Sequence, residues 1–267
     1  MKNSPVTPPP APADMPADVP AGVRPVRVLD AADLRLVETP VPVLSAEHEE
    51  GMERAWARAV AAQPSLFDGP AAVCTALEPE PDGSALRLSW ARTSYRRLAL
   101  RRVPGAPVVS SVFVSVVLPV EGGRIVVGRM SASTAAPGRW QLPGGNVEPP
   151  ARHRALDEGE LRRQAAKELS EEVGVDTDPA GLVRLAVTVG EHGNVGLHYL
   201  APPLPEQDVL ARFATLLAAE AARGRAAELA ELALPASPAD LAGIDGPHVD
   251  YLAPLLEHWS IRRGAPS

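Results

Sequence analysis

Hydrophobic and polar positions divide the chain into two regions with different patterns. In the first region, residues 46–62 predict a helix, because Ser45 is a suitable N-cap and acidic residues fill the first turn. Residues 71–77 and 85–91 are strand-like runs separated by a Pro- and Gly-containing turn. Residues 26–107 are therefore expected to form a small α+β N-terminal domain.

The second region begins with a long β-branched run. Residues 108–120 are nearly continuously apolar, which is typical of a buried strand. The Glu-Gly-Gly turn at 121–123 predicts a hairpin, with residues 124–129 returning as the second strand. Residues 160–173 predict a helix that ends at Gly174.

The remaining chain continues this alternation of strands and helices. Strands are expected at 182–189 and 195–201, an alanine-rich helix over about 206–233, and a last helix over 247–260. Residues 108–267 thus predict a domain of the α/β class.

Proline content sets the expectation for the N-terminus. Residues 1–25 contain eight prolines, which exclude a helix or a central strand. We expect a solvated, polyproline-like tail there.

Charge and composition narrow the class of partner. The formal net charge is −7, which disfavours a dedicated nucleic-acid-binding protein. The single cysteine, Cys74, cannot build a disulfide framework or a thiolate metal site. No apolar run reaches the ~18–20 residues of a membrane span, and no secretory signal is visible. The sequence therefore predicts a cytoplasmic protein without a membrane or nucleic-acid partner.

Candidate chemistry concentrates on the helix expected at 160–173. Glu168, Glu171 and Glu172 stand at positions i, i+3 and i+4, so they project from one helix face. Three carboxylates so close repel one another, and a divalent cation would remove that repulsion. Mg²⁺ prefers carboxylate and water oxygens and bridges to phosphates. This face is therefore a candidate magnesium–diphosphate platform.

Two features weigh against the alternative of an ordinary solvated acidic face. On the opposite side of the helix, apolar residues recur every four positions and would pack on a sheet. These residues are Leu161, Ala165, Leu169 and Val173. A double-glycine turn, Gly144-Gly145, also follows a strand upstream of the helix, and an ordinary acidic face does not explain this order of elements.

The segments LPGGNVE (142–148) and KELSEEVGV (167–175) resemble the Nudix box, G-x5-E-x7-R-E-U-x-E-E-x-G-U, where U is a bulky aliphatic residue. The resemblance covers residues 108–201 in the order of elements. It implies a Nudix-type α/β/α sandwich around a mixed sheet, and hydrolysis of a diphosphate linkage in a nucleoside diphosphate derivative.

Three features depart from the family pattern. Gly145 and Glu168 are separated by 22 residues, where the pattern has 14, so a loop insertion is expected between them. The acidic residue in the middle of the box is also out of register by one position, and Glu158, Glu160 or neither fills that role. Lys167 stands where the family has Arg, which removes a planar fork that can orient a carboxylate.

The resemblance implies roles for the remaining residues of the box. Glu168, Glu171, Glu172 and the carbonyl of Gly145 would hold Mg²⁺, with Mn²⁺ as a substitute. Glu168 and Glu171 would also act in catalysis, with Lys167 in place of the orienting Arg. Substrate contacts are expected from Gly144, Glu148 and Glu191. For Glu191, the alternative of an acidic residue in a simple hairpin is favoured over a role at the site.

The substrate and the oligomeric state depend on weaker features. Residues 66–70 (LFDGP) and 88–95 (LSWARTSY) faintly resemble the leading domain of Nudix UDP-sugar diphosphatases, which favours an NDP-sugar substrate. Nudix-type domains often dimerise, so a homodimer is possible. The alternative to an enzyme is a catalytically impaired Nudix-fold module that binds a nucleotide for regulation.

Overall fold

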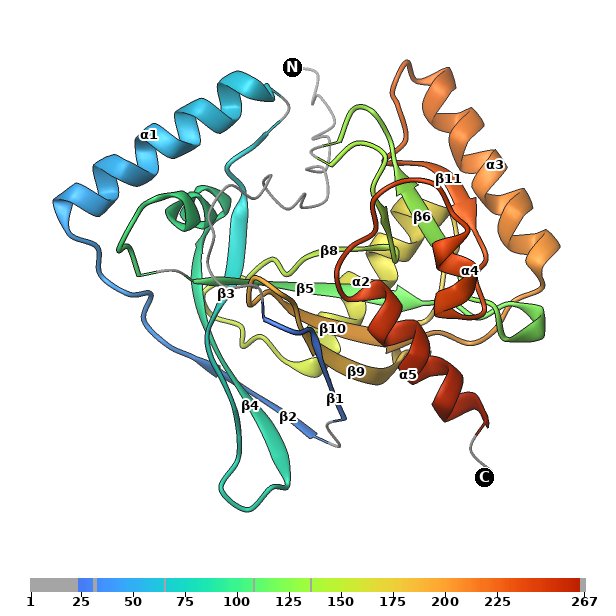
Figure 1. Ribbon diagram of the computed structural model, residues 1–267, viewed down its shortest axis with the longest axis horizontal. Helices are drawn as coiled ribbons and strands as arrows, with labels where there is room; N and C mark the ends of the chain where they lie inside the picture. The colour runs from blue at the N-terminus through green and yellow to red at the C-terminus, as the bar shows by residue number, and fades with distance from the viewer. Residues whose placement is uncertain (1–23, 31–32, 65, 108, 135, 265–267) are drawn as a thin grey trace.

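The computed structural model describes residues 24–30, 33–64, 66–107, 109–134 and 136–264 (Figure 1). The tail expected at 1–25 lies almost entirely outside them. Eleven strands are assigned within the described residues: β1 Arg27–Leu29, β2 Asp33–Glu38, β3 Pro70–Pro79, β4 Ala85–Ser94, β5 Ser110–Val117, β6 Val127–Met130, β7 Trp140–Gln141, β8 Gly144–Asn146, β9 Val183–Val189, β10 Val195–Leu200 and β11 Leu229–Ala233. The α-helices there are α1 Ala46–Ala62, α2 Glu158–Val173, α3 Glu206–Ala222, α4 Pro238–Ala242 and α5 Leu252–Gly264, and 3₁₀ turns are η1 Tyr95–Arg102, η2 Glu121–Gly123 and η3 Pro179–Gly181.

The central sheet is mixed. Its strand order is β1-β9-β10-β5-β3-β4-β2, and β8 also pairs with β5. The β10–β5 and β4–β2 pairs are parallel, whereas β9, β3 and β8 pair antiparallel to their neighbours. A second, three-stranded sheet has the order β11-β6-β7.

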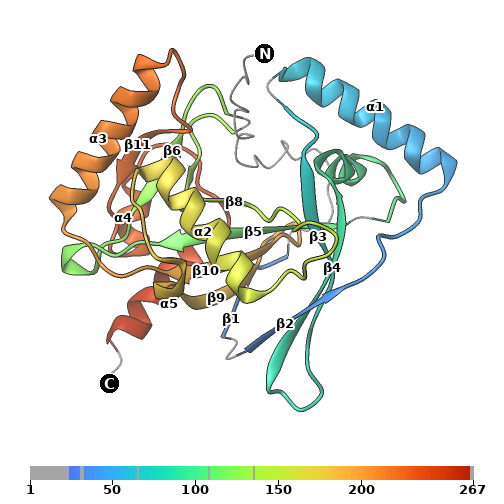
Figure 2. The ribbon, with the colours of Figure 1, turned by 180° about the vertical axis from the view of Figure 1, so that it is seen from behind.

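Helices cover both faces of the central sheet, as Figures 1 and 2 show from opposite sides. On one face, Leu161, Leu169 and Val173 of α2 belong to the same buried cluster as Val114 of β5 and Phe213 of α3. On the other face, the residues of α5 pack in a second apolar cluster. The predicted α/β/α sandwich with a mixed sheet is therefore confirmed.

The N-terminal strands extend the central sheet. β3 pairs with β5 at Val73↔Ser111 and Cys74↔Ser110, and β1 pairs with β9 at the opposite edge. Helix α1 packs against η1 through a separate apolar cluster. Whether residues 26–107 form a domain of their own stays a prediction, but their strands share a sheet with the strands that follow residue 108.

Two element predictions were wrong. The helix expected over 206–233 ends at Ala222, because Gly224 adopts a left-handed φ of 68° and residues Leu229–Ala233 pair as β11 with β6. The expected hairpin of 108–120 with 124–129 is reduced to one bridge, Pro119↔Ile125. Strand β6 then leaves β5 and joins the second sheet, so sheet pairing outweighs alanine's helix propensity and the local turn.

Candidate active site

Two consecutive glycines bring β8 against β5. Gly144 pairs with Ser115 and Gly145 with Val114. A Cβ on Gly144 would lie 2.2 Å from the carbonyl oxygen of Val114, so only glycine fits there. A Cβ on Gly145 would lie 2.6 Å from Oε1 of Glu168, which places this turn directly against an α2 carboxylate.

Helix α2 is fixed at both ends. The Asp157 side chain caps its N-terminus by accepting from the backbone N–H of Glu160 at 2.7 Å. Gly174 ends it in the left-handed conformation at φ 76°. The apolar face, as predicted, is buried through Leu161, Ala165, Leu169 and Val173. A carboxylate on the opposite face therefore has a fixed backbone beneath it.

Glu172 is the most deeply buried carboxylate of the site. The residue is 1% exposed, and its Oε2 accepts a hydrogen bond from the backbone N–H of Gly144 at 2.8 Å. Its Oε1 is also buried and has no hydrogen-bond partner. Burial and the nearby charges of Glu228 and Glu168 raise the pKa of Glu172 well above its ordinary value. A buried oxygen without a hydrogen-bond partner lowers the stability of the fold. A ligand that binds this atom would remove that cost.

Glu168 shares this environment. Burial raises its pKa to about 8, and the charges of Glu228, Glu171 and Glu148 act in the same direction, while Lys167 opposes them. Glu168 is therefore a group that can hold or release a proton near neutral pH.

Glu171 lies toward solvent and pairs with Lys167, at 3.3 Å between Nζ and Oε2. Burial opposes the charge on Lys167, but Glu171, Glu168 and Glu148 outweigh it and raise the lysine pKa. The residue in the family's Arg position thus lies among the acidic side chains of α2.

Glu228 is a functional candidate that sequence reasoning missed. It immediately precedes β11, and its charge contributes to the raised pKa of both Glu168 and Glu172. Its backbone carbonyl accepts from Ser131 N–H at 2.8 Å, next to β6. No motif marks it, and the helix expected through 206–233 placed it in the wrong kind of element.

The other predicted residues lie in different surroundings. Glu148 is exposed, and its backbone pairs with the side chain of Gln164. Glu158 pairs with Arg184 at 2.6 Å and Glu160 with Arg163 at 2.6 Å. Glu191 lies in the β9–β10 turn, where its N–H donates to Asp250 at 2.6 Å. Its part in substrate binding stays a prediction.

The donor chemistry of the site fits a hard divalent cation. Its carboxylates offer oxygen ligands, and the unpartnered Oε1 of Glu172 would gain a partner. Across the described ranges, no three His, Cys, Asp or Glu side chains are gathered closely enough to hold a metal. Completing a ligand set would therefore require side-chain movement, such as release of Glu171 from Lys167.

The family comparison agrees with this architecture. The family profile of the NUDIX domain matches residues 110–251, more than half of the 267 residues. No curated protein matches the chain. Within the described residues, no helix has the length and apolar character needed to cross a membrane.

Similar solved structures include three Nudix proteins. The MutT protein from Methanosarcina mazei Go1 is 18% identical, with a TM-score of 0.38 and coverage of 58% of this chain and 96% of that chain. The NUDIX domain of Shewanella oneidensis NrtR, complexed with ADP ribose, is 17% identical, with a TM-score of 0.38 and coverage of 58% and 88%. The Nudix hydrolase RenU from M. Smegmatis is 16% identical, with a TM-score of 0.32 and coverage of 59% and 88%.

A mixed sheet between helices, with an acidic helix against a double-glycine turn, defines an α/β protein with an oxygen-rich anionic site. The chain belongs to the NUDIX family. It is a Nudix pyrophosphohydrolase, and its class of reaction is hydrolysis of a pyrophosphate linkage in a nucleotide derivative. Hydrolases of this family generally use a divalent metal such as Mg²⁺.

Proposed function

We propose that this protein hydrolyses the diphosphate linkage of a nucleoside diphosphate derivative in a Mg²⁺-dependent reaction, with an NDP-sugar as the leading candidate. The observation that carries the proposal is the buried, unpartnered Oε1 of Glu172 beside the high-pKa carboxyl of Glu168. Glu168, Glu171, Glu172 and the Gly145 carbonyl would hold the cation, and Mn²⁺ would substitute for Mg²⁺.

The bound cation would neutralise phosphate charge and make a bound water a better nucleophile. The protein's own residues have separate tasks. The Gly144 N–H fixes the carboxylate of Glu172, so that its free oxygen keeps one direction. Glu168 would accept a proton from the attacking water as a general base. Lys167 pairs with Glu171 and limits its repulsion of the other carboxylates until a cation is bound.

The substrate proposal rests on the resemblance of two N-terminal segments to UDP-sugar diphosphatases. In the structure those segments also have local roles. Asp68 accepts from the N–H of Arg96 at 2.9 Å, which fixes the start of η1. Trp90 is 1% exposed and belongs to the core cluster. An NDP-sugar is therefore the first substrate to test.

A substrate panel tests the function. NDP-sugars, ADP-ribose, dinucleoside polyphosphates and NADH are incubated with Mg²⁺ or Mn²⁺, and product release is measured with and without EDTA. We expect hydrolysis of at least one diphosphate, loss of it in EDTA, and severe impairment in Glu171→Gln. The control is Glu231→Gln, which alters an exposed carboxylate paired with Arg129. Turnover that survives both EDTA and Glu171→Gln would overturn the mechanism.

A further inference from the structure

The middle of the Nudix box lacks an available acidic residue. Glu158 is engaged by Arg184 and Arg162, at 2.6 and 3.8 Å. Glu160 is engaged by Arg163 at 2.6 Å and by Arg154 at 3.6 Å. Both carboxylates therefore serve ion pairs at the start of α2 rather than the acidic site.

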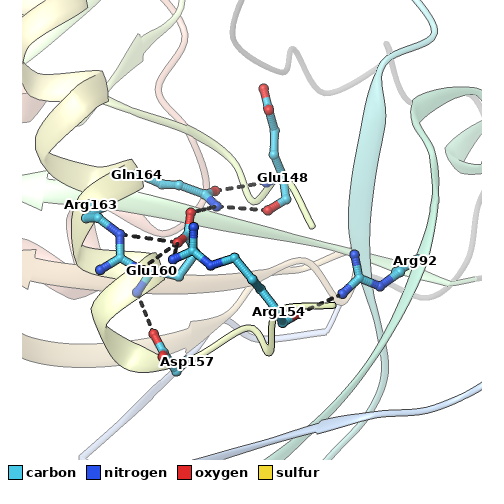
Figure 3. A network of polar contacts seen from close by, with 7 residues as sticks. All are labelled: Arg92, Glu148, Arg154, Asp157, Glu160, Arg163 and Gln164. Carbon is cyan, nitrogen blue, oxygen red and sulfur yellow. Dashed lines mark hydrogen bonds and ion pairs between the residues drawn. The ribbon is translucent and has the colours of Figure 1, made fainter. Parts of the chain in front are cut away.

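The backbone of Glu148 is held by Gln164, which stands in α2 one turn before Glu168. The side-chain amide of Gln164 forms hydrogen bonds with both the N–H and the carbonyl oxygen of Glu148. The Glu148 N–H donates to Gln164 Oε1 at 2.9 Å, and Gln164 Nε2 donates to the Glu148 carbonyl at 2.8 Å. Figure 3 shows the two contacts as a closed pair. Because two opposite bonds fix both position and orientation, the Glu148 backbone cannot rotate freely about this contact.

The Gln164 amide is itself supported by the ion-pair network of Glu160. Gln164 Nε2 lies 3.5 Å from Glu160 Oε1, and Arg163 Nη2 donates to Glu160 Oε2 at 2.6 Å. The Asp157 cap fixes the backbone N–H of Glu160 at 2.7 Å. Glu160 thus acts on the amide that holds Glu148.

The inserted loop is anchored from the N-terminal strands. Arg92 of β4 donates to the carbonyl oxygens of Pro150 and, at 3.3 Å, Arg154. The arginine is in turn held by Glu38, at 2.7 Å from Nε, and lies over the ring of Trp90. In Figure 3 this side chain reaches from β4 to the loop. The loop is therefore fixed to β4, and Glu148 is exposed.

The backbone of Glu148 lies against α2, because Gln164 stands one helical turn before Glu168. Gly145, three residues before Glu148, also lies against Glu168, where an added Cβ would be 2.6 Å from Oε1. An exposed carboxylate with a fixed backbone at this position can offer oxygen to a hard cation.

We propose that Gln164 is a positioning residue that fixes Glu148 beside the carboxylates of α2, and that Glu148 takes the place of the acidic residue missing from the middle of the Nudix box. This inference rests on the proposed function, because it assigns Glu148 to the cation–diphosphate site. Gln164 acts through Glu148 and touches neither cation nor substrate.

A double-mutant cycle on Mn²⁺ binding tests the inference without turnover. Mn²⁺ affinity is measured by electron paramagnetic resonance for the wild type, Glu148→Gln, Gln164→Met and the double variant. Each single variant is expected to weaken Mn²⁺ binding about tenfold. The double variant is expected to bind no more weakly than either single variant, because both remove the same contribution. Gln207→Ala, in the exposed first turn of α3, is the control and should bind as the wild type does.

Three results would overturn the inference. Wild-type affinity in Glu148→Gln would show that this carboxylate does not serve the cation, whatever the state of the Gln164 variants. Wild-type Mn²⁺ affinity in a folded Gln164→Met variant would show that Gln164 has no positioning role. If the fold loss of Mn²⁺ affinity in the double variant equals the product of the two single losses, the two residues act independently. Mn²⁺ binding by the wild type keeps the proposed function intact in all three cases, whereas a wild type that binds no Mn²⁺ contradicts both.

Discussion

The carboxylate of Glu172 accepts a hydrogen bond from the backbone N–H of Gly144 at 2.8 Å, across 28 residues of sequence. This bond joins the acidic helix to the double-glycine turn. It satisfies one oxygen of a fully buried carboxylate and leaves the other, Oε1, without a partner. Burying this unpartnered oxygen lowers the stability of the fold, as is expected where a binding site is built at the expense of stability.

The two glycines of the turn predict opposite outcomes for the same substitution. Gly144→Ala would put a Cβ 2.2 Å from the Val114 carbonyl oxygen, so we expect a loss of stability of more than about 2 kcal/mol in urea unfolding. Gly145→Ala would instead press on the Glu168 carboxylate at 2.6 Å, which is the mobile end of a side chain. We expect it to retain most of its stability and to lose Mn²⁺ affinity. Equal effects of the two variants on both measurements would contradict this arrangement.

The raised carboxyl pKa values predict how stability depends on pH. Burial raises the pKa of Glu168 from 4.5 to about 8, so the folded state binds this proton more tightly than the unfolded state does. In the metal-free protein, the contribution of Glu168 to stability should therefore be fully present below pH 4.5. This contribution should be lost as the pH rises toward 8. Glu172 acts in the same direction.

Thermal melts between pH 6.5 and 8 in EDTA check this dependence. Burial lowers the pKa of His198 to about 3. Protonation of this histidine in the unfolded state therefore lowers the stability of the fold only as the pH falls below 6.5, outside this window. Saturating Mg²⁺ should raise the melting temperature most at pH 8. A flat profile in EDTA, or an equal slope in the Glu168→Gln and Glu172→Gln double variant, would rule out these carboxylates as its cause.

Glu228 is expected to belong to the same site. Its charge raises the pKa of both Glu168 and Glu172, so Glu228→Gln should lower these pKa values and remove an acidic group close to both carboxyls. We expect Mn²⁺ affinity or kcat to fall about tenfold or more. Glu231→Gln, three residues after Glu228 and at an exposed ion pair in β11, is the matched control. Equal activity of the two variants would place Glu228 outside the site.

Arg92 predicts a link between the N-terminal strands and the inserted loop. Arg92→Ala removes donors to two loop carbonyls and the ion pair with Glu38, so the loop should open more often. Limited trypsin digestion should cleave after Arg152 and Arg154 faster in this variant. Arg35→Ala, which alters a largely exposed arginine paired with Glu80, is the control. Unchanged cleavage in Arg92→Ala would show that the loop is held by other contacts.

Local signals along the chain predicted much of the fold. Ser45 and Gly174, the predicted helix ends, cap α1 and α2, and the four-residue apolar period identified the buried face of α2. These features depend on residues within one or two turns, so the sequence contains them explicitly.

The features that the sequence did not predict depend on contacts between distant segments. The strand at Leu229–Ala233 forms because β6 offers it a partner about a hundred residues away, although its composition favours a helix. Glu228 reaches the site only through that pairing. The pattern of α2 assigns no function to Gln164. Its contact with the backbone of Glu148 can be recognised only from the structure.

The measurement that tests the central claim most directly is the Mg²⁺-dependent kcat/KM of Glu172→Gln against the wild type, on the diphosphate that the wild type hydrolyses, together with thermal stability in EDTA. The substitution keeps the shape of the side chain and removes the ionisable carboxyl group. We predict a loss of kcat/KM of at least about a hundredfold, or roughly 3 kcal/mol, and an equal or higher melting temperature in EDTA at pH 8. A variant that retains wild-type kcat/KM in Mg²⁺ would contradict the claim that Glu172 supports a cation in this site.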